Sequence, residues 1–279
     1  MSVVGALRPL PVEVVSVQSQ VVYGHVGNSA AVPVLQRAGL RVAPVPSVLL
    51  GNTPHYPTMH GGVVPEAWFG GFLDDLEARG ATRALRLVQV GYLGSAAQAA
   101  LLARWIGRRL EASPPPFVQV DPVIGDHDHG IYVDPALVDG WRALLPLADG
   151  LTPNGFELAH LAGGAPDDID AVAAAARRLL AGRTQWVVVT SAAPAQWRPG
   201  RMLVAVVTRE RVEVIEHARV DAAPKGTGDY FAATLAVGML AGRPLVAAAR
   251  AAADAVVAAL QATRAAACEE LLIDLPGTP

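Results

Sequence analysis

Residues 224–235 read PKGTGDYFAATL, a Gly-Thr-Gly turn that runs directly into a stretch with strong helical character. We expect a helix over residues 227–240, with the GTG turn at its start. Glycines let a backbone approach an oxyanion closely, and the free N–H groups and positive dipole of a first helical turn stabilise its charge. The segment therefore predicts an anion-binding turn formed by Gly226, Thr227 and Gly228.

Asp229 directly follows this turn. A carboxylate beside a bound phosphate would repel it, unless its role is to take a proton from the hydroxyl group that attacks that phosphate. Asp229 is therefore a candidate general base. Taken alone, a GxGD segment is more often a glycine turn with an acidic helix cap, so other parts of the sequence have to decide.

Short β-branched runs alternate with longer helical stretches, the pattern of a parallel sheet with crossover helices. We expect strands at residues 12–17, 87–90, 117–120 and 186–190. We expect helices at residues 28–38, 67–79, 96–110, 156–161, 169–180, 227–240 and 246–267. Residues 201–220 instead predict a β-hairpin, which makes the α/β sheet mixed, and Pro114 to Pro116 predict a rigid loop before a central strand.

The composition describes a folded protein without a charged interaction face. Of 279 residues, 52% are hydrophobic and 17% charged, which allows a large core, and the lack of a linker predicts one domain over 1–279 with flexible ends at 1–10 and 275–279. A net charge of −3 argues against nucleic acid or anionic lipid as partner.

Two further features concern the location of the protein. The apolar stretch 245–267 contains Arg250, Asp254 and Arg264, so it predicts an amphipathic helix and not a membrane span. The N-terminus lacks a secretory signal, which favours the cytoplasm. Cys268 is the single cysteine and is expected to be a structural or surface thiol.

Several motifs together resemble a known family. GTGD before a small-residue helix is similar to the catalytic signature of ribokinase-like (PfkB-type) kinases, and SVQS at 16–19 with VVYGHVGN at 21–28 closely resembles the N-terminal signature of pyridoxal kinases. GYLG at 91–94, DPVIGD at 121–126 and TPNGFE at 152–157 follow in the family's order. This ordered set favours the catalytic interpretation of Asp229 and implies a ribokinase-like fold.

The resemblance implies ATP as phosphate donor, with Mg²⁺. Asp121, Asn154 and Glu157 then lie around the phosphates, Asp121 and Glu157 hold the metal, directly or through water, and Thr152 lines the same region. Without the resemblance, these residues indicate only local structure. Asp121 would lie in a turn at the end of a strand, and residues 154–157 would form a helix N-terminus with an acidic residue in its first turn. The further ATP contacts that the resemblance implies are Thr190, Ser191, Thr227 and Gly228, with a monovalent cation such as K⁺ near the first two.

For the ring-binding end, the resemblance implies Ser19 as a polar contact, Val26 and Val48 as apolar walls and Tyr92 on the ring face, with Asp229 at the reacting hydroxyl. An apolar slot with a few placed polar groups suits an aromatic ring. Without the resemblance, Val26 and Tyr92 are equally well explained as core packing.

The chain departs from the family in three places. Residues 47–56 read SVLLGNTPHY where many pyridoxal kinases have a segment like SVQFSNHTxY, which leaves the ring substrate open. Lys225 adds a positive charge beside the GTG turn, and we hypothesise that it neutralises the transferred phosphate. The run HDHG at 127–130 predicts either a loop that covers the nucleotide or an exposed turn; its HxH spacing lacks a third metal ligand.

The leading interpretation is ATP-dependent phosphorylation of the 5′-hydroxymethyl group of pyridoxal, and of pyridoxine or pyridoxamine, to give pyridoxal 5′-phosphate or its analogue. One alternative is a kinase of the same fold that acts on hydroxymethylpyrimidine or another small alcohol. Another is a catalytically silent vitamin B6-binding protein, although ring binding alone needs neither the GTG turn nor Asp229. Relatives with these motifs are commonly homodimers, so the resemblance implies a homodimer.

Overall fold

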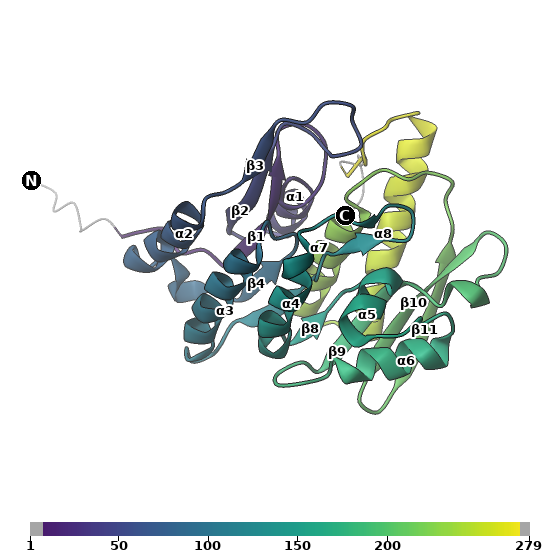
Figure 1. The fold of residues 1–279 in the computed structure, drawn as a ribbon. Helices are drawn as coiled ribbons and strands as arrows, with labels where there is room; N and C mark the ends of the chain where they lie inside the picture. Colours follow the sequence, from purple (N-terminus) through teal and green to yellow (C-terminus); the bar gives the residue numbers. More distant parts are fainter. Residues whose placement is uncertain (1–7, 274–279) are drawn as a thin grey trace, which may run out of the picture.

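The computed structural model describes residues 8–273 and contains a nine-stranded sheet (Figure 1). Its strands are β1 (Val14–Val21), β2 (Val42–Leu50), β3 (Gly61–Val63), β4 (Leu87–Val90), β5 (Phe117–Val120), β8 (Gly150–Leu151), β9 (Trp186–Ala192), β10 (Arg201–Thr208) and β11 (Val212–Ala218). Their order is β11-β10-β9-β8-β5-β4-β1-β2-β3. The neighbouring strands β2, β1, β4, β5, β8 and β9 run parallel to one another. At one edge β3 pairs antiparallel with β2, and at the other edge β10 pairs antiparallel with both β9 and β11.

Helices cover both faces of this sheet. They are α1 (Asn28–Arg37), α2 (Glu66–Ala78), α3 (Ala96–Leu110), α4 (Pro135–Leu144), α5 (Gly155–Ala162), α6 (Ile169–Arg178), α7 (Thr227–Leu240) and α8 (Leu245–Ala265). The helices from α2 to α6 pack on one face, and α1, α7 and α8 pack on the other (Figure 1). A separate two-stranded ribbon, β6 (Gly125–Asp126) and β7 (Gly130–Ile131), follows β5.

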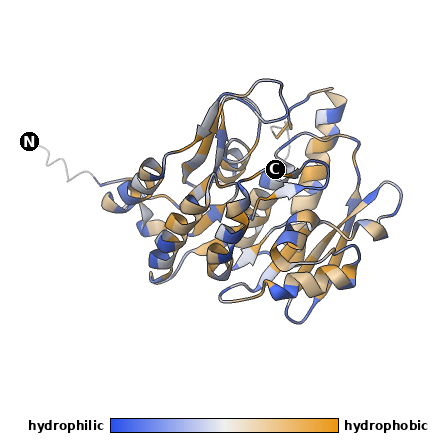
Figure 2. Ribbon diagram, viewed as in Figure 1, coloured by the Kyte–Doolittle hydropathy of each residue, from blue (hydrophilic) through white to orange (hydrophobic). Residues whose placement is uncertain are grey.

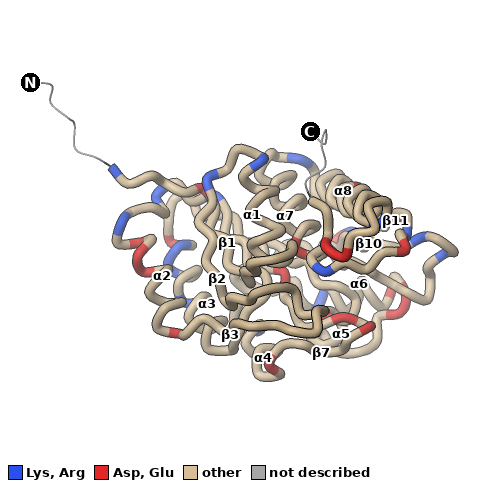
Figure 3. The backbone as a smooth tube through the Cα atoms, turned by 90° about the horizontal axis from the view of Figure 1, so that it is seen from above, with Lys and Arg blue, Asp and Glu red and all other residues tan. Residues whose placement is uncertain are grey.

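The alternation of side chains along the strands builds the two cores. Val15 and Val17 of β1 point to the larger core beside α3, whereas Val14 packs with Leu35 of α1 on the other face. The central strands are mainly hydrophobic because both of their faces are buried, although β4 and β5 each contain one buried glutamine, Gln89 and Gln119 (Figure 2). Figure 3 shows basic and acidic residues interspersed around the outside of the fold.

The predicted α/β architecture is confirmed, including the hairpin and the loop before β5. The strands at 87–90 and 117–120 and the helices at 96–110 and 227–240 have the predicted bounds, and other elements differ by a few residues. β1 begins two residues later than predicted and continues to Val21. The antiparallel edge at β3 is an addition to the predicted fold.

Two elements were missed for reasons that the structure explains. The sequence analysis named no strand at β2, which contains Pro44 and Pro46. The strand tolerates both prolines because β3 pairs only with residues 48–50, so they stand where β2 has an unpaired edge. The helix α4 begins with an Asp134 cap and Pro135 in its first turn, a start signal that the sequence interpretation overlooked.

The long apolar helix α8 is a packing element of this fold. Among the described residues it is long and apolar enough to cross a membrane by length and composition. Its alanines at 248, 249, 252 and 253 are buried against α7 and the hairpin strands. The flexible ends predicted for 1–10 and 275–279 lie, apart from residues 8–10, outside the described residues.

Candidate active site

The site motifs lie where parallel strands end and α7 begins. β4 leads into Gly91 and Tyr92, β5 into Asp121, and β8 into Thr152. Because the carboxyl ends of parallel strands meet at one edge of a sheet, these loops converge there. The GTG turn faces them: Asp121 Oδ2 lies 3.8 Å from the position that a Cβ on Gly228 would occupy.

Gly226 joins the GTG turn to the N-terminal YGHVGN segment. It caps α7 with φ 95°, a left-handed conformation that favours glycine. A Cβ at this position would also overlap the carbonyl oxygen of His25. The turn predicted to bind the anion is thus packed directly on the segment predicted to face the ring substrate.

Asp229 stands in the first turn of α7 and is partly exposed. Its carboxylate accepts hydrogen bonds from the backbone N–H of Gly27 and from its own N–H, both of which favour the ionised form. Burial outweighs them and raises the Asp229 pKa to about 6. The carboxyl group is therefore ionised near neutral pH and close to the pKa that suits a general base.

Asp121 is buried next to two other acids. Burial, followed by the negative charges of Glu157 and Asp229, raises its pKa well above the usual range, and the nearby Thr152 hydroxyl opposes this rise only in part. Burial likewise raises the Glu157 pKa to about 7, despite backbone N–H groups that bind its carboxylate. These three acids form one cluster of like charge that a cation would stabilise.

Asn154 and Glu157 close the N-terminus of α5 with a capping box. Glu157 N–H donates to Asn154 Oδ1 and Asn154 N–H donates to Glu157 Oε2, both at 2.8 Å. Glu157 Oε1 also accepts from Ile124 N–H at 3.0 Å, and the Asn154 amide donates to the Gly125 carbonyl at 2.8 Å. The capping box confirms the predicted helix start, and the bonds to Ile124 and Gly125 also tie the TPNGFE motif to the DPVIGD motif.

Thr190 and Ser191 lie at the end of β9 beside this motif. Thr190 N–H donates to the Pro153 carbonyl at 3.0 Å and Thr190 forms a bridge with Asn154. Ser191 has φ 48°, and its carbonyl oxygen lies 3.1 Å from the position that a Cβ on Gly155 would occupy. Both residues are brought to the same end of the sheet as Asp121.

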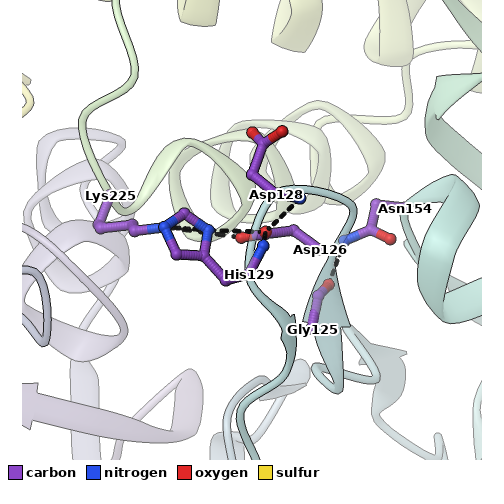
Figure 4. A network of polar contacts seen from close by, with 6 residues as sticks. All are labelled: Gly125, Asp126, Asp128, His129, Asn154 and Lys225. Atoms are coloured by element: carbon purple, nitrogen blue, oxygen red, sulfur yellow. Dashed lines mark hydrogen bonds and ion pairs between the residues drawn. The ribbon is translucent and has the colours of Figure 1, made fainter.

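Lys225 reaches from the GTG turn to the β6–β7 ribbon (Figure 4). Its Nζ lies 3.5 Å from Asp126 Oδ2 and 3.3 Å from His129 Nδ1. Asp126 Oδ1 accepts the N–H groups of Asp128 and His129 at 3.0 and 2.8 Å. Although burial opposes it, the bonds from His129 and the charge of Lys225 lower the Asp126 pKa.

The HDHG segment forms an exposed turn between β6 and β7. It is linked to Lys225 by the contacts of Asp126 and His129 with the Lys225 ammonium group. His127 and His129 belong to the turn and not to a strand. Over residues 8–273, no group of three or more His, Cys, Asp or Glu side chains is placed to hold a metal ion.

The residues predicted for the ring-binding end come together around β1 and β2. Ser19 is buried at the end of β1, where its hydroxyl would overlap a Cβ on Gly27. Val48 is buried on β2, with Cγ1 2.9 Å from the position of a Cβ on Gly94. Tyr92 is half-buried, and its carbonyl accepts a bond from Ser47 Oγ at 2.5 Å.

Comparison with known proteins agrees with this geometry. The sequence model of the phosphomethylpyrimidine kinase family matches residues 75–270. A pyridoxine/pyridoxal/pyridoxamine kinase of Bordetella bronchiseptica is 60% identical over 272 residues, covering 97% of this chain and 96% of the relative. The chain belongs to the pyridoxal kinase family.

More distant members of the pyridoxal kinase family share the same fold. A pyridoxal kinase PdxY of Leifsonia xyli is 32% identical over 79% of this chain and 78% of its own length. The solved structure of Leishmania donovani pyridoxal kinase with ADP and pyridoxine has a TM-score of 0.86 at 26% identity, covering 94% of this chain and 90% of that one. The ribokinase-like fold predicted from the motifs is thereby confirmed.

Within this pyridoxal kinase fold, Tyr132 is a further candidate site residue, 46% exposed, that the sequence analysis did not name. Burial, followed by the charges of Glu157, Asp126, Asp229 and Asp121, raises the pKa of its hydroxyl. The side chain therefore stands within electrostatic reach of the acid cluster, just after β7. The sequence did contain a signal for Tyr132: it is an aromatic residue that closely follows the polar HDHG run, which was predicted to cover the nucleotide or to form an exposed turn.

Proposed function

We propose that this chain is an ATP-dependent kinase that phosphorylates the 5′-hydroxymethyl group of pyridoxal, and of pyridoxine and pyridoxamine. One observation carries the proposal: the YGHVGN segment donates the Gly27 N–H to Asp229, so one contact joins the ring-binding end to the base behind the GTG turn. The names of the relatives with pyridoxine, pyridoxal and pyridoxamine as substrates support the same substrate class.

In the proposed reaction, Asp229 takes the proton of the substrate hydroxymethyl group. The hydroxyl oxygen of the substrate then forms a bond to the γ-phosphorus of ATP. The bond from that phosphorus to the bridging oxygen breaks, and ADP leaves with the electron pair. The N–H groups of Gly226, Thr227 and Gly228 stabilise the transferred phosphoryl group. Such a reaction needs positioning and charge stabilisation more than covalent chemistry by the protein.

Mg²⁺ is the divalent cation that the pair Asp121 and Glu157 would fit best. Asp121 and Glu157 supply hard oxygen ligands, and few protein ligands suit an ion that keeps several waters. Glu157 already accepts backbone N–H bonds, so it would act through metal-bound water. Bound Mg²⁺ supplies charge neutralisation on the phosphates.

The other ATP contacts in this proposal lie along the same edge. Asn154 would orient the phosphates, and Thr190 and Ser191 would hold them with a K⁺ ion at the end of β9. The adenosine end would lie in a cavity of about 430 Å³ between the end of β11 and the end of α8, which is lined by Ala218, Arg219, Val220, Gln261, Arg264 and Ala265. The chain leads from this cavity straight to Lys225 and the GTG turn.

In the proposed complex, Lys225 neutralises charge on the transferred phosphate. In the structure its ammonium group is held by Asp126 and His129, at the edge of the anion-binding turn. A phosphate entering the turn would compete for this ammonium group, because phosphate carries more negative charge than one carboxylate.

The ring of the substrate would lie between Tyr92 and Val48, with Val26 as a second apolar wall and Ser19 as the polar contact. These groups occupy the ends of β1, β2 and β4 in the structure. An aromatic substrate gains affinity from stacking and apolar contact, and orientation from a few hydrogen bonds.

We propose a homodimer in the cytoplasm, with residues 8–273 acting as one kinase domain. Large apolar side chains are exposed on β2, β3 and α2, including Leu49, Val63, Trp68 and Phe72. Clustered exposed apolar residues of this kind mark protein interfaces more often than solvent faces. A second copy of the chain is the partner that this face would bind.

The second candidate function is phosphorylation of hydroxymethylpyrimidine, which the match to the phosphomethylpyrimidine kinase family favours. The purified protein should be assayed with Mg·ATP and pyridoxal, pyridoxine, pyridoxamine or hydroxymethylpyrimidine, with and without K⁺. We expect turnover of the three B6 vitamers at a kcat/KM at least about tenfold above that of the pyrimidine, a discrimination of one well-placed contact. Faster turnover of the pyrimidine would support the second candidate, and vitamer binding without turnover would support the silent binding protein.

A further inference from the structure

A buried acid outside the described machinery, Glu270, lies between two loops of the ring-binding end. It is 5% exposed and follows α8 in the C-terminal segment, more than 200 residues from the loops that it touches. Buried carboxylates are retained only with specific partners, because taking a charge out of water is costly. The partners of Glu270 therefore indicate what it does.

The first loop that Glu270 contacts is the 53–56 segment, where the sequence departs from the family pattern. The buried Thr53 hydroxyl donates to Glu270 Oε1 at 3.2 Å and lies 2.9 Å from His55 Nδ1. Since the Thr53 proton is directed to Glu270, Thr53 accepts the proton of His55 Nδ1. One carboxylate thus fixes both the hydroxyl rotamer and the His55 tautomer.

Two aromatic rings complete this contact. Partial burial, followed by the nearby carboxylate of Glu270, raises the pKa of the Tyr56 hydroxyl, and the Tyr23 and Tyr56 ring centroids lie 6.0 Å apart. The His55 and Tyr56 rings lie with centroids 4.2 Å apart. His55 is the basic side chain that faces Glu270, with Nε2 3.9 Å from Oε1.

The second loop is the YGHVGN segment. Glu270 Oε2 packs on Gly24, where a Cβ would overlap it, and Gly24 has φ 95°. The next residue, Leu271, accepts a bond from His25 Nδ1 through its carbonyl at 2.7 Å. The C-terminal segment therefore contacts the YGHVGN turn directly. The same turn binds Asp229 through the Gly27 N–H and packs on Gly226 through the His25 carbonyl.

We propose that Glu270 is a positioning residue that joins the 53–56 segment to the YGHVGN turn and thereby sets the affinity of the enzyme for its ring substrate. The inference rests on the proposed function, since it assigns a role at the ring-binding end of that site. Glu270 does not touch the phosphate end in the structure, so its loss should weaken vitamer binding while ATP binding stays near its normal level.

The test is a steady-state comparison of Glu270→Gln with wild type, with Glu269→Gln as the matched control. Glu269 is exposed and one residue away, so its variant makes the same charge change without the buried contacts. We expect Glu270→Gln to raise the KM for pyridoxal about tenfold, the loss of one buried charged hydrogen bond, with the KM for ATP changed less than about twofold. Equal changes in both KM values, or no change in either, would overturn the proposal.

A double-mutant cycle with Thr53→Val separates positioning from general destabilisation. If Glu270 acts through Thr53, the effects of Glu270→Gln and Thr53→Val on the pyridoxal KM are strongly non-additive, whereas two independent packing defects would add. Thr53→Val also carries the test alone if Glu270→Gln fails to fold, and an unchanged pyridoxal KM in a folded Thr53→Val protein would contradict the proposal.

Hydrogen exchange tests the proposal without turnover. We expect faster amide exchange of residues 23–27 and 52–56 in Glu270→Gln, with unchanged exchange at residues 226–230 and in Glu269→Gln. Wild-type protein without kinase activity would refute the proposed function and leave this structural link standing. Unchanged exchange in both loops would refute the link, whatever the activity.

Discussion

At the phosphate end of the site the acidic side chains stand at the ends of regular elements, whereas two segments of the ring end, the 53–56 segment and the YGHVGN turn, are loops held by a distant part of the chain. Asp121, Glu157 and Asp229 follow a strand end or begin a helix, and backbone N–H groups bind two of them. Thr53 and His25 depend on the C-terminal segment around Glu270 instead. The acids of the phosphate end are therefore held by local backbone contacts, and the loops of the ring end by contacts far apart in the sequence.

The largest expected effect comes from Gly226→Ala, at the contact between the two ends. The new Cβ would meet the His25 carbonyl in a left-handed conformation, so the GTG turn must move. We expect kcat/KM to fall by about 100-fold or more for both substrates, because small displacements of an anion hole are costly. Steady-state kinetics with ATP and pyridoxal measure this.

Gly242→Ala is the control for Gly226→Ala. Gly242 follows α7 with φ 75° and has open space around the added Cβ. We expect a loss of about 1 kcal/mol in the free energy of unfolding and an unchanged kcat. Equal kinetic losses in the two variants would show that the glycine conformation matters and the packing on His25 does not.

The pH dependence of the reaction sharpens the assignment of the base. Burial raises the Asp229 pKa to about 6, so the ionised base is lost as the pH falls through that value. We expect kcat/KM for pyridoxal to fall about tenfold per pH unit below pH 6 and to level off above pH 7. The profile should be measured from pH 5 to pH 8 at saturating ATP, and a flat profile down to pH 5 would contradict Asp229 as the base.

A smaller effect is expected at the ring face. Tyr92→Leu removes an aromatic contact while keeping an apolar side chain, so we expect the KM for pyridoxal to rise about fivefold to tenfold with the KM for ATP unchanged. Tyr92→Phe keeps the ring and should change neither value by more than about twofold. Titration of vitamer binding in both variants checks this. A larger change in the KM for ATP than in the KM for pyridoxal would contradict the assignment of Tyr92 to the ring-binding end.

The smallest expected effect is that of Lys225→Ala. Lys225 is held by Asp126 and His129, so its loss removes one partly solvated charge near the phosphates. We expect the KM for ATP to rise about twofold to fivefold, less at high ionic strength. If both turnover and nucleotide affinity are unchanged, Lys225 serves only to latch the β6–β7 ribbon.

The local structure at the proposed phosphate end could be predicted from the sequence because its residues belong to short local patterns. GTGD, DPVIGD and TPNGFE are short motifs that fold as turns and helix starts, and the structure places them at one edge of the sheet. The capping box of Asn154 and Glu157 follows from residue spacing alone.

The ring end resisted prediction because its contacts link residues far apart in sequence. No local pattern relates Glu270 to Thr53, which are 217 residues apart, or His25 to Leu271. The strand β2 was also not expected, and its prolines are tolerated because they lie where β3 does not pair with it. Tyr132 lies beside the acids only because the β6–β7 ribbon folds back over them.

The central claim is that Asp229 is the base of a phosphoryl transfer, and Asp229→Asn tests it most directly. The amide keeps the shape of the side chain, so pyridoxal and ATP should still bind, while kcat should fall by about 10²–10⁴-fold. Folding offers an independent readout. Because burial raises the Asp229 pKa from 3.8 to about 6, the ionised group destabilises the folded protein increasingly as pH rises from about 4 to 7.

The measurement is therefore kcat, together with the thermal midpoint of unfolding, for wild type and Asp229→Asn at pH 8. The account predicts that Asp229→Asn loses turnover but still binds the vitamer. Its thermal midpoint should be no lower than that of wild type and up to about 2–5 °C higher. A folded Asp229→Asn protein that turns over pyridoxal within about tenfold of the wild-type rate would contradict it.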